Sequence, residues 1–351
     1  MPQSSRIKHS GENSGGPGIA GRLRSSWFII ALLTVLIIHQ MSPNWHPKDL
    51  LDSVVEISAL GNLLVAVLFF IQGLGMDVSV LIRSLKRSDF HLRSQLTIFF
   101  IFPLLCGIPA ALILTSLESL APGLAALGLP SAVLLLSVLP TTVSSSTVYT
   151  RLEGGASELA LINAVLANIL GILLSPLLVS LLLQLGSAGF SPTEAAGMVL
   201  SLLINAGVPL IGGTLLRLIM SYGKSPRRKL PGGAISQLII LLIVLLSPMK
   251  STGGMSLGVS FILAALLYAS IARITLTAGR RLPEDEQTAL FFLGTQKTMA
   301  MGLPLLHQLK AMGAAVDGGI TLLIVYHALQ LIVGRLGIPG LSPVKSSGDQ
   351  K

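Results

Sequence analysis

A single lysine stands in the middle of an apolar segment near the C-terminal end of the chain. Residues 291–304 read FFLGTQKTMAMGLP, with Lys297 at the centre. A charged side chain at the centre of a bilayer costs roughly 2.5–3.5 kcal/mol on insertion scales, so this ammonium is expected to face the interior of a helix bundle. Because no Asp or Glu lies near the middle of any apolar segment, its expected partners are carbonyls at a helix end, hydroxyl groups or an anionic ligand.

The residues beside Lys297 are small and polar, namely Gly294, Thr295, Gln296 and Thr298. They predict an interruption of the helix at this point. Two interpretations of the lysine stay open. It is either a structural tie between two half-helices or a fixed positive charge that binds substrate anions or titrates, and the two roles are compatible.

Hydroxyl groups crowd a second apolar segment. Pro140 is followed there by a run of hydroxyl residues that includes Thr141, Thr142, Ser144, Ser145 and Ser146. Proline removes a backbone donor and clashes with the preceding turn, so it predicts a second helix break. The hydroxyls can bind substrate or a metal cation, or they can be small residues that let helices pack closely. We expect Lys297 to face Ser145 and Ser146.

Further neutral polar residues lie in two other apolar segments. Asn163 and Asn168 follow the hydroxyl run, and His327 and Gln330 are three residues apart, which places them on one face of a helix. For His327 a satisfied hydrogen bond between helices is one interpretation, and a proton carrier near neutral pH is the other.

The composition is that of a membrane protein. Hydrophobic residues make up 52% of the 351 residues and charged residues 11%, whereas soluble domains carry about 25% charged residues. Cys106 is the only cysteine, so no disulfide forms within the chain, and it is expected to be a small buried hydrophobe.

Ten apolar segments are long enough to be considered as spanning helices. They lie at about 26–41, 54–76, 95–117, 129–150, 156–185, 194–220, 232–249, 254–278, 286–309 and 314–336. Residues 26–338 are predicted to form one transmembrane domain, with a disordered cytoplasmic N-terminus at 1–25 and a cytoplasmic tail at 339–351.

The basic residues are distributed unevenly between the loops. Of the 24 lysines and arginines, 20 fall in the two termini and one set of alternate loops, and three fall in the other set. This asymmetry predicts a multi-pass protein of the plasma (inner) membrane with both termini in the cytoplasm. It also accounts for the net charge of +9, so we do not expect a nucleic-acid partner.

An all-α polytopic fold with two inverted five-helix repeats, about 26–185 and 194–336, is predicted from this count. Segments 4 and 9 correspond in such repeats, and both are the interrupted ones. Discontinuous helices at matching positions mark the binding site of many transporters, because unwound backbone at membrane depth is tolerated only around a cavity or inside protein. We expect helices 4 and 9 to cross at their breaks.

Enzymatic chemistry has little support. The sequence contains no Gly-rich phosphate loop, no His/Cys cluster with metal spacing and no pair of intramembrane aspartates. We expect no catalytic residues and no cofactor, and the sequence leaves sodium open.

Three stretches are similar to a known family. LPTTVSSSTVYTRLEGGASELALINAV, at 139–165, resembles the fourth and fifth segments of the bile acid:sodium symporter family. GTQKTMAMGLPLL and LLIVYHALQLIVG look most like its SBF-like branch, which is related to sodium/bile acid cotransporter 7, and IQGLGMDVSVL at 71–81 matches as well. The resemblance implies ten helices, a panel domain beside a core domain with crossed broken helices, and alternating access.

The resemblance also implies where the sodium ligands of the family fall. Its Ser-Asn pair falls on Ser145 and Ser146, its shared glutamate on Phe292, and the following glutamine and asparagine on Gln296 and Lys297. The principal sodium carboxylate is therefore replaced by an aromatic ring, and a cation stands close by. A hard cation such as sodium prefers a cage of oxygen atoms, which a neighbouring lysine opposes.

The sequence as a whole predicts a secondary active transporter of a small organic anion in the lipid bilayer, with Lys297 in place of the family's sodium. One alternative is a sodium-coupled symporter with a weak metal site at Ser145, Ser146 and Gln296. The other is a non-transporting membrane regulator that kept the fold. Protein partners cannot be named from the sequence.

Overall fold

The protein is described by a computed structural model that covers residues 19–41, 57–76, 87–121, 127–185, 191–221, 232–247 and 253–337. All regular secondary structure in these ranges is helical. The expected cytoplasmic tail and residues 1–18 lie outside them. The first helix, α1 (Ile19–Met41), starts within the segment 1–25 that was expected to be disordered.

The first half of the chain contains one long helix with π-helical turns and one broken helix. After α3 (Ile57–Gly75), one helical stretch runs through α5 (Ser88–Leu96), the π-helices η1 (Thr97–Ile101) and η2 (Pro103–Gly107), and α6 (Ile108–Leu120). The next pair, α8 (Leu129–Val138) and α9 (Val143–Leu152), is bent by 64° at a short break. α10 (Ser157–Leu185) is continuous.

The second half has the same kinds of element. α11 (Pro192–Leu202), the π-helix η3 (Leu203–Gly207) and α12 (Val208–Ser221) form one stretch, followed by α13 (Gly232–Leu246) and α14 (Gly253–Gly279). α15 (Glu284–Thr295) and α16 (Met299–Ala311) are separated by a second short break, and α17 (Gly319–Leu336) is the last helix.

Five of these stretches are long and apolar enough to cross a membrane, and the bent pair α8–α9 makes a sixth. The five are 88–119, 157–184, 192–220, 257–279 and 319–336. Helices also lie in the other predicted segments, but in the described part of the chain their apolar stretches are shorter, at 27–38, 59–75 and 233–246, or are broken. The ten-span inverted repeat therefore stays a prediction, whereas the all-helical membrane fold is confirmed.

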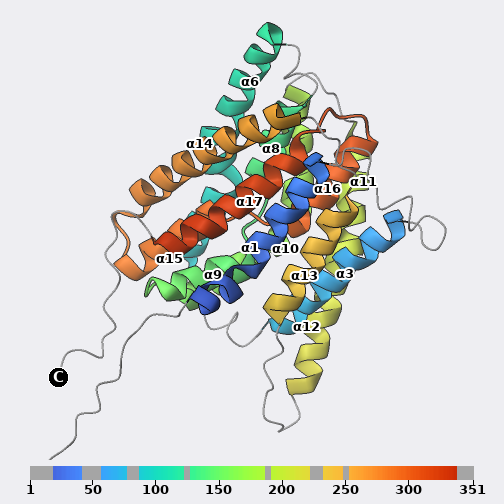
Figure 1. The fold of residues 1–351 in the computed structure, drawn as a ribbon. Helices are drawn as coiled ribbons and strands as arrows, with labels where there is room; N and C mark the ends of the chain where they lie inside the picture. The colour runs from blue at the N-terminus through green and yellow to red at the C-terminus, as the bar shows by residue number, and fades with distance from the viewer. Residues whose placement is uncertain are drawn as a thin grey trace, which may run out of the picture.

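The helices form two neighbouring groups (Figure 1). α3 packs mainly against α12 and α13, while α14 packs against α15 and α17, and α10 against α8 and α9. Glycine allows the closest of these approaches, because a Cβ on Gly73 or Gly213 would collide with backbone atoms of Leu210 or Phe70. Small residues at such crossings are typical of membrane helices.

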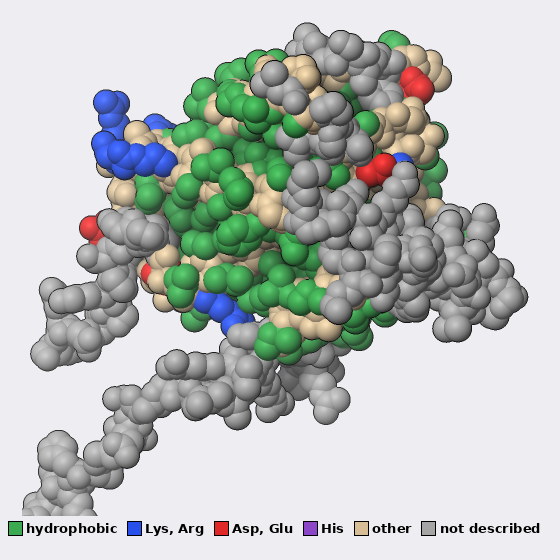
Figure 2. Space-filling model, turned by 45° about the horizontal axis from the view of Figure 1, so that its top comes forward, with side chains coloured by type: hydrophobic (Ala, Val, Ile, Leu, Met, Phe, Trp, Pro, Cys, Tyr) green, Lys and Arg blue, Asp and Glu red, His purple; other side chains and the backbone are tan. Residues whose placement is uncertain are grey.

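The surface between the helix ends is apolar. Figure 2 shows hydrophobic side chains over much of the visible face, with lysine and arginine near its margins. Large exposed hydrophobics occur on several helices, among them Leu112, Ile113, Val208, Ile211 and Leu266. A soluble protein rarely exposes so continuous an apolar surface, which fits contact with lipid.

Candidate functional site

The two predicted breaks are present and touch each other. α8 ends at Val138 and α9 begins at Val143, while α15 ends at Thr295 and α16 begins at Met299. The Thr298 N–H donates a hydrogen bond of 3.0 Å to the Pro140 carbonyl. One peptide group of each break thus binds the other, and the two interrupted helices meet where they are unwound.

The carbonyl groups of the first break are all used. Seven consecutive carbonyl oxygens around Pro140 accept hydrogen bonds, although most of this stretch is not helical. The acceptors and donors are Leu136 with the Leu139 N–H, Ser137 and Leu139 with Lys297 Nζ, Val138 with Ser175 Oγ, Pro140 with the Thr298 N–H, Thr141 with Asn168 Nδ2, and Thr142 with Ser146 Oγ. Side chains of α9, α10 and the second break, together with two backbone N–H groups, therefore satisfy these carbonyls.

The Lys297 ammonium lies between the first break and the neighbouring π-helix. Its side chain is buried, and Nζ donates to the carbonyls of Leu139 at 2.7 Å, Ser137 at 2.9 Å and Ile98 at 3.1 Å. Nζ also lies 4.5 Å from the centre of the Phe102 ring. The C-terminal end of α8 carries partial negative charge, which favours a cation at this position. An ammonium has three N–H donors, and all three are used.

The expected orientation of Lys297 toward Ser145 and Ser146 is wrong. Ser145 Oγ donates instead to Gln296 Oε1 at 2.8 Å and also contacts the Thr142 hydroxyl. The lysine side chain is long enough to reach the carbonyl groups at the C-terminal end of α8, which have no helical N–H partner. For an ammonium without a carboxylate partner, these carbonyls are stronger acceptors than the hydroxyls. Of the partners considered from the sequence, helix-end carbonyls are the ones found.

The peptide group of Lys297 is held by the last helix. Gln330 Oε1 accepts from the Lys297 N–H at 2.7 Å, and Gln330 Nε2 donates to the Lys297 carbonyl at 2.9 Å. Gln330 Nε2 also lies 2.8 Å from His327 Nδ1. Tyr326, the next residue toward the N-terminus, donates its hydroxyl proton to the Thr295 carbonyl at 2.9 Å. Two side chains of α17, Gln330 and Tyr326, thus replace missing helical bonds of the second break, and His327 contacts Gln330.

The two asparagines lie in different places. Asn168 Nδ2 binds the Thr141 carbonyl at 2.8 Å and so belongs to the first break. Asn163 lies nearer the start of α10, where its side-chain oxygen meets Ser94 and His91, with His91 Nδ1 at 3.0 Å. Asn163 therefore joins α10 to α5 and lies away from the crossing of the breaks.

The remaining predicted residues have local roles in the breaks. Thr298 begins α16, where its side chain accepts from the Ala300 N–H, and Thr295 Oγ1 binds the Phe291 carbonyl within α15. The Ser144 side chain is exposed on α9. Thr141 Oγ1 is buried and has no hydrogen-bond partner.

Phe292, the position that the resemblance matches to a sodium carboxylate, is fully buried among aromatic rings. Its ring centre lies 5.2 Å from that of Phe291 and 5.8 Å from that of Tyr149. The site at this position is apolar, so it offers no ligand for a hard cation.

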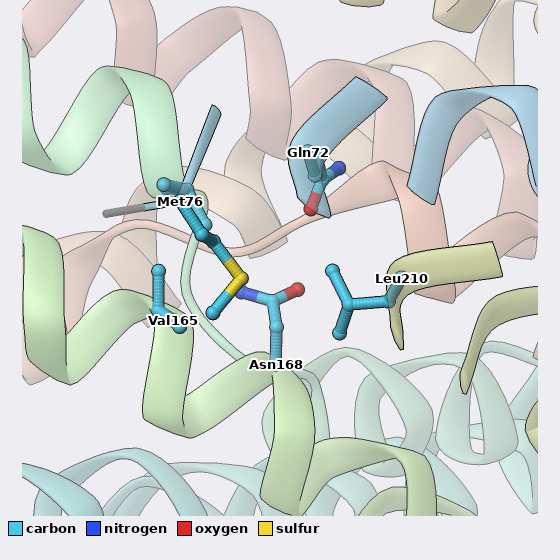
Figure 3. Close-up of a pocket in the computed structure, with 6 residues that line it drawn as sticks. Gln72, Met76, Val165, Asn168 and Leu210 are labelled. Atoms are coloured by element: carbon cyan, nitrogen blue, oxygen red, sulfur yellow. The ribbon is translucent and has the colours of Figure 1, made fainter. Parts of the chain in front are cut away.

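A small, partly open cleft of about 10 Å³, with room for roughly one water molecule, lies beside the first break (Figure 3). It lies between α3 and α12 on one side and α9 and α10 on the other, and it is lined by Gln72, Met76, Val143, Val165, Asn168 and Leu210. The amides of Gln72 and Asn168 point toward the same space in Figure 3. Asn168 contributes both to the cleft and to the first break.

Several groups of this site were not predicted as site residues. Ile98 and Phe102 stand in an apolar segment without a conspicuous motif, and Gln72 lies in the matched stretch 71–81 but was not singled out. Pro103, inside an apolar run, was the one available signal that a carbonyl in this helix would lack its backbone donor.

Comparison with known proteins places the chain in a family. The model of the SBF-like CPA transporter family matches residues 26–338. Sodium/bile acid cotransporter 7-B of Xenopus laevis is 28% identical over 92% of this chain and 93% of its own length. Sodium/bile acid cotransporter 7 of Danio rerio is 27% identical over 95% and 98%, and that of Rattus norvegicus is 26% identical over 91% and 93%.

These matches span almost all the helices described above, including both breaks. They agree with the apolar helices and surface in showing an integral, multi-pass membrane protein. The family and these relatives are transporters, so the chain is not an enzyme. The chain belongs to the SBF-like CPA transporter family.

Proposed function

We propose that this protein is a secondary transporter of a small organic anion that works by alternating access, with the Lys297 ammonium in the place of a coupling sodium ion. The names of its relatives, sodium/bile acid cotransporters, support the substrate class. The observation that carries the proposal is the buried ammonium at the meeting point of two broken helices, close to a cleft. We also propose ten spans in two inverted repeats, because the two breaks occupy corresponding positions.

The ammonium supports this role through its charge rather than through a direct bond. All three N–H donors of Lys297 go to carbonyl groups, so none is left for a substrate in this conformation. Its positive charge nevertheless raises the local potential, since an isolated charge in a low-dielectric interior acts over a longer range than in water. We propose that this potential stabilises an anion when the neighbouring cleft opens further.

The positions of the cleft and of one polar contact support alternating access. The cleft separates α3 and α12 from α9 and α10. Elsewhere in the bundle α11 meets α16, where Gln308 Nε2 donates to Ser201 Oγ at 2.9 Å (Figure 1). We propose that the narrow cleft and this polar contact are places where the helices separate during the cycle.

The proposed topology predicts opposite labelling of two loops. The basic residues put position 225 in the cytoplasm and position 187 outside. Cysteines introduced at Ser225 and Ser187 should react with a membrane-impermeant maleimide from opposite sides of the membrane. Cys106 is buried and serves as a low background. Reaction of both positions from one side contradicts the ten-span arrangement.

A direct test of the substrate class is a thermal-shift screen of the purified protein with bile acids such as taurocholate and with other organic anions. A ligand that binds the folded state raises the melting temperature by mass action. Each anion is measured in sodium chloride and in choline chloride, and hits are tested for uptake into proteoliposomes. The proposal predicts stabilisation and uptake that are the same in both salts.

Gln72 is predicted to contribute to substrate affinity without supporting the fold. It is half-buried and lines the cleft. Gln72→Leu should weaken anion binding roughly tenfold, through loss of one hydrogen bond of about 0.5–1.5 kcal/mol, and leave stability within about 0.5 kcal/mol. Isothermal titration and melting curves measure the two effects. Asn62→Leu, at an exposed position of the same helix, is the matched control and should change neither.

A degenerate sodium site is the second candidate, and one contact favours it. Ser145 Oγ and Gln296 Oε1 lie 2.8 Å apart, which brings together two of the three proposed ligands. Ser146 Oγ, the third, donates to the Thr142 carbonyl. Uptake that requires sodium and is lost in Gln296→Leu would decide for this candidate.

A further inference from the structure

The three carbonyl oxygens around Lys297 Nζ have a feature in common: each lies where the chain has no backbone N–H to offer it. Together with the Phe102 ring they surround the ammonium. We propose that these carbonyls and the ring form a cage for one weakly hydrated monovalent cation of the size of ammonium or potassium, which Lys297 fills from within the chain. The cage extends the proposed function, on which its role in transport rests.

Pro103 leaves the first oxygen, the carbonyl oxygen of Ile98, without a backbone N–H donor. In η1 the Phe102 N–H donates to the Thr97 carbonyl, five residues earlier. The next residue would donate to Ile98 in the same pattern, but it is a proline and has no N–H. The Ile98 carbonyl is therefore left for Lys297, at 3.1 Å.

The helix break at Pro140 leaves the other two oxygens, those of Ser137 and Leu139, without backbone N–H donors. Leu139 and Thr142 have extended backbone, with ψ of 145° and 131°, so the helical pattern stops before Pro140 and restarts after it. The carbonyls of Ser137 and Leu139 lie at this end, where helix carbonyls have no intrahelical partner. Lys297 Nζ binds both. One ammonium thus satisfies acceptors that two prolines in different helices leave open.

The dimensions of the cage select the kind of cation. The three N···O distances are 2.7, 2.9 and 3.1 Å. Oxygen atoms hold calcium, an ion close to sodium in size, at about 2.3–2.6 Å. The distances here are longer and are those of an ammonium group, and carbonyl oxygens can replace the hydration shell of a monovalent ion of that size. The face of an aromatic ring adds attraction for ammonium-type cations.

The experiment removes the lysine side chain from the cage and supplies free cations in solution. Lys297→Ala removes the tethered ammonium and leaves room in its place. The purified full-length variant is melted in chloride salts of ammonium, methylammonium, potassium, sodium and choline at equal ionic strength. We expect a lower melting temperature than wild type in choline, a recovery that grows with the logarithm of the ammonium or potassium concentration, and a smaller recovery with sodium. The wild-type protein should melt alike in all five salts.

Lys297→Met is the matched control, because its side chain fills the space without a charge. It should melt at a reduced temperature that no salt corrects. Pro103→Ala supplies a second test, since it returns an N–H to the Ile98 carbonyl. It should stabilise the Lys297→Met protein more than it stabilises wild type.

Three results overturn the cage. They are a Lys297→Ala protein as stable as wild type in choline, an equal response to choline and ammonium, or a response to ammonium in Lys297→Met as well. Should Lys297→Ala unfold during extraction in choline, the membranes are solubilised in ammonium chloride. Recovery of folded protein there supports the cage, and loss in both salts contradicts it.

These melting experiments need no substrate, so they separate the cage from transport. If ammonium stabilises Lys297→Ala but the wild-type protein takes up no anion, the cage is supported and the proposed function is contradicted. If the wild-type protein takes up an anion but no salt stabilises Lys297→Ala, the proposed function is supported and the cage is contradicted.

Discussion

Replacement of Lys297 by methionine is expected to reduce anion transport at least tenfold while the protein still inserts into the membrane. A tenfold loss corresponds to about 1.4 kcal/mol, which is modest for removal of the positive charge beside the cleft. Methionine keeps much of the side-chain volume but cannot donate to the carbonyls of Ile98, Ser137 and Leu139. Uptake by proteoliposomes is measured and divided by the amount of folded protein.

The matched control is Lys310→Met. Lys310 is partly exposed in the last turn of α16, and its ammonium pairs with Asp317 at 2.8 Å. An exposed pair contributes about 0–1 kcal/mol, so this variant should transport within twofold of wild type, a change of about 0.4 kcal/mol. If Lys297 is only a structural tie, the methionine variant loses stability, but the molecules that fold transport normally. Wild-type uptake per folded molecule in Lys297→Met removes the ammonium from the mechanism.

Gln330→Leu is expected to cause a large loss of stability. Gln330 is fully buried and holds both the N–H and the carbonyl of Lys297, at 2.7 and 2.9 Å. A buried polar group without a partner costs about 1–3 kcal/mol, and leucine leaves two such groups. We expect a loss of about 2–5 kcal/mol, observed as a lower melting temperature and weaker resistance to denaturant.

Gln287→Leu is the comparison for this variant. Gln287 Nε2 binds one carbonyl, that of Leu282, at 2.8 Å, and its side chain is only half-buried. Its replacement should cost about 1 kcal/mol. Equal stability of the two variants would show that the second break does not depend on α17.

The two breaks were predictable because their causes are local. Pro140 cannot continue a helix, and Gly294 with three polar neighbours weakens one. The hydrogen bond between Thr298 and Pro140 then follows from placing the breaks side by side. The pairing of His327 with Gln330 also follows from helical spacing.

The partners of Lys297 were not predictable at the level of single residues. The Ile98 carbonyl becomes available through a π-helix, and no sequence pattern specifies that pattern of hydrogen bonds five residues apart. It also lies 199 positions from Lys297 along the chain. Likewise, Asn163 shares a polar character with Asn168, but helical rotation turns it toward His91 and Ser94.

The cleft depends on packing between distant segments and was also missed. Gln72 and Leu210 reach it from α3 and α12, which approach closely because Gly73 and Gly213 lack side chains. Glycine in an apolar segment indicates a close approach without naming the partner. The sequence therefore predicts the positions of the helix breaks better than it predicts which residues of other helices contact them.

The covalent attachment of the ammonium has a consequence for the energy source of transport. A sodium ion that binds and is released moves down its own gradient and drives the substrate with it, whereas Lys297 stays with the protein in every cycle. Without another coupled ion, the substrate moves only down its own electrochemical gradient. The membrane potential, about 2.3 kcal/mol per charge per 100 mV, drives an anion out of a cell whose interior is negative. On the proposed function, a built-in cation therefore favours export of an anion, whereas coupling to sodium would favour import.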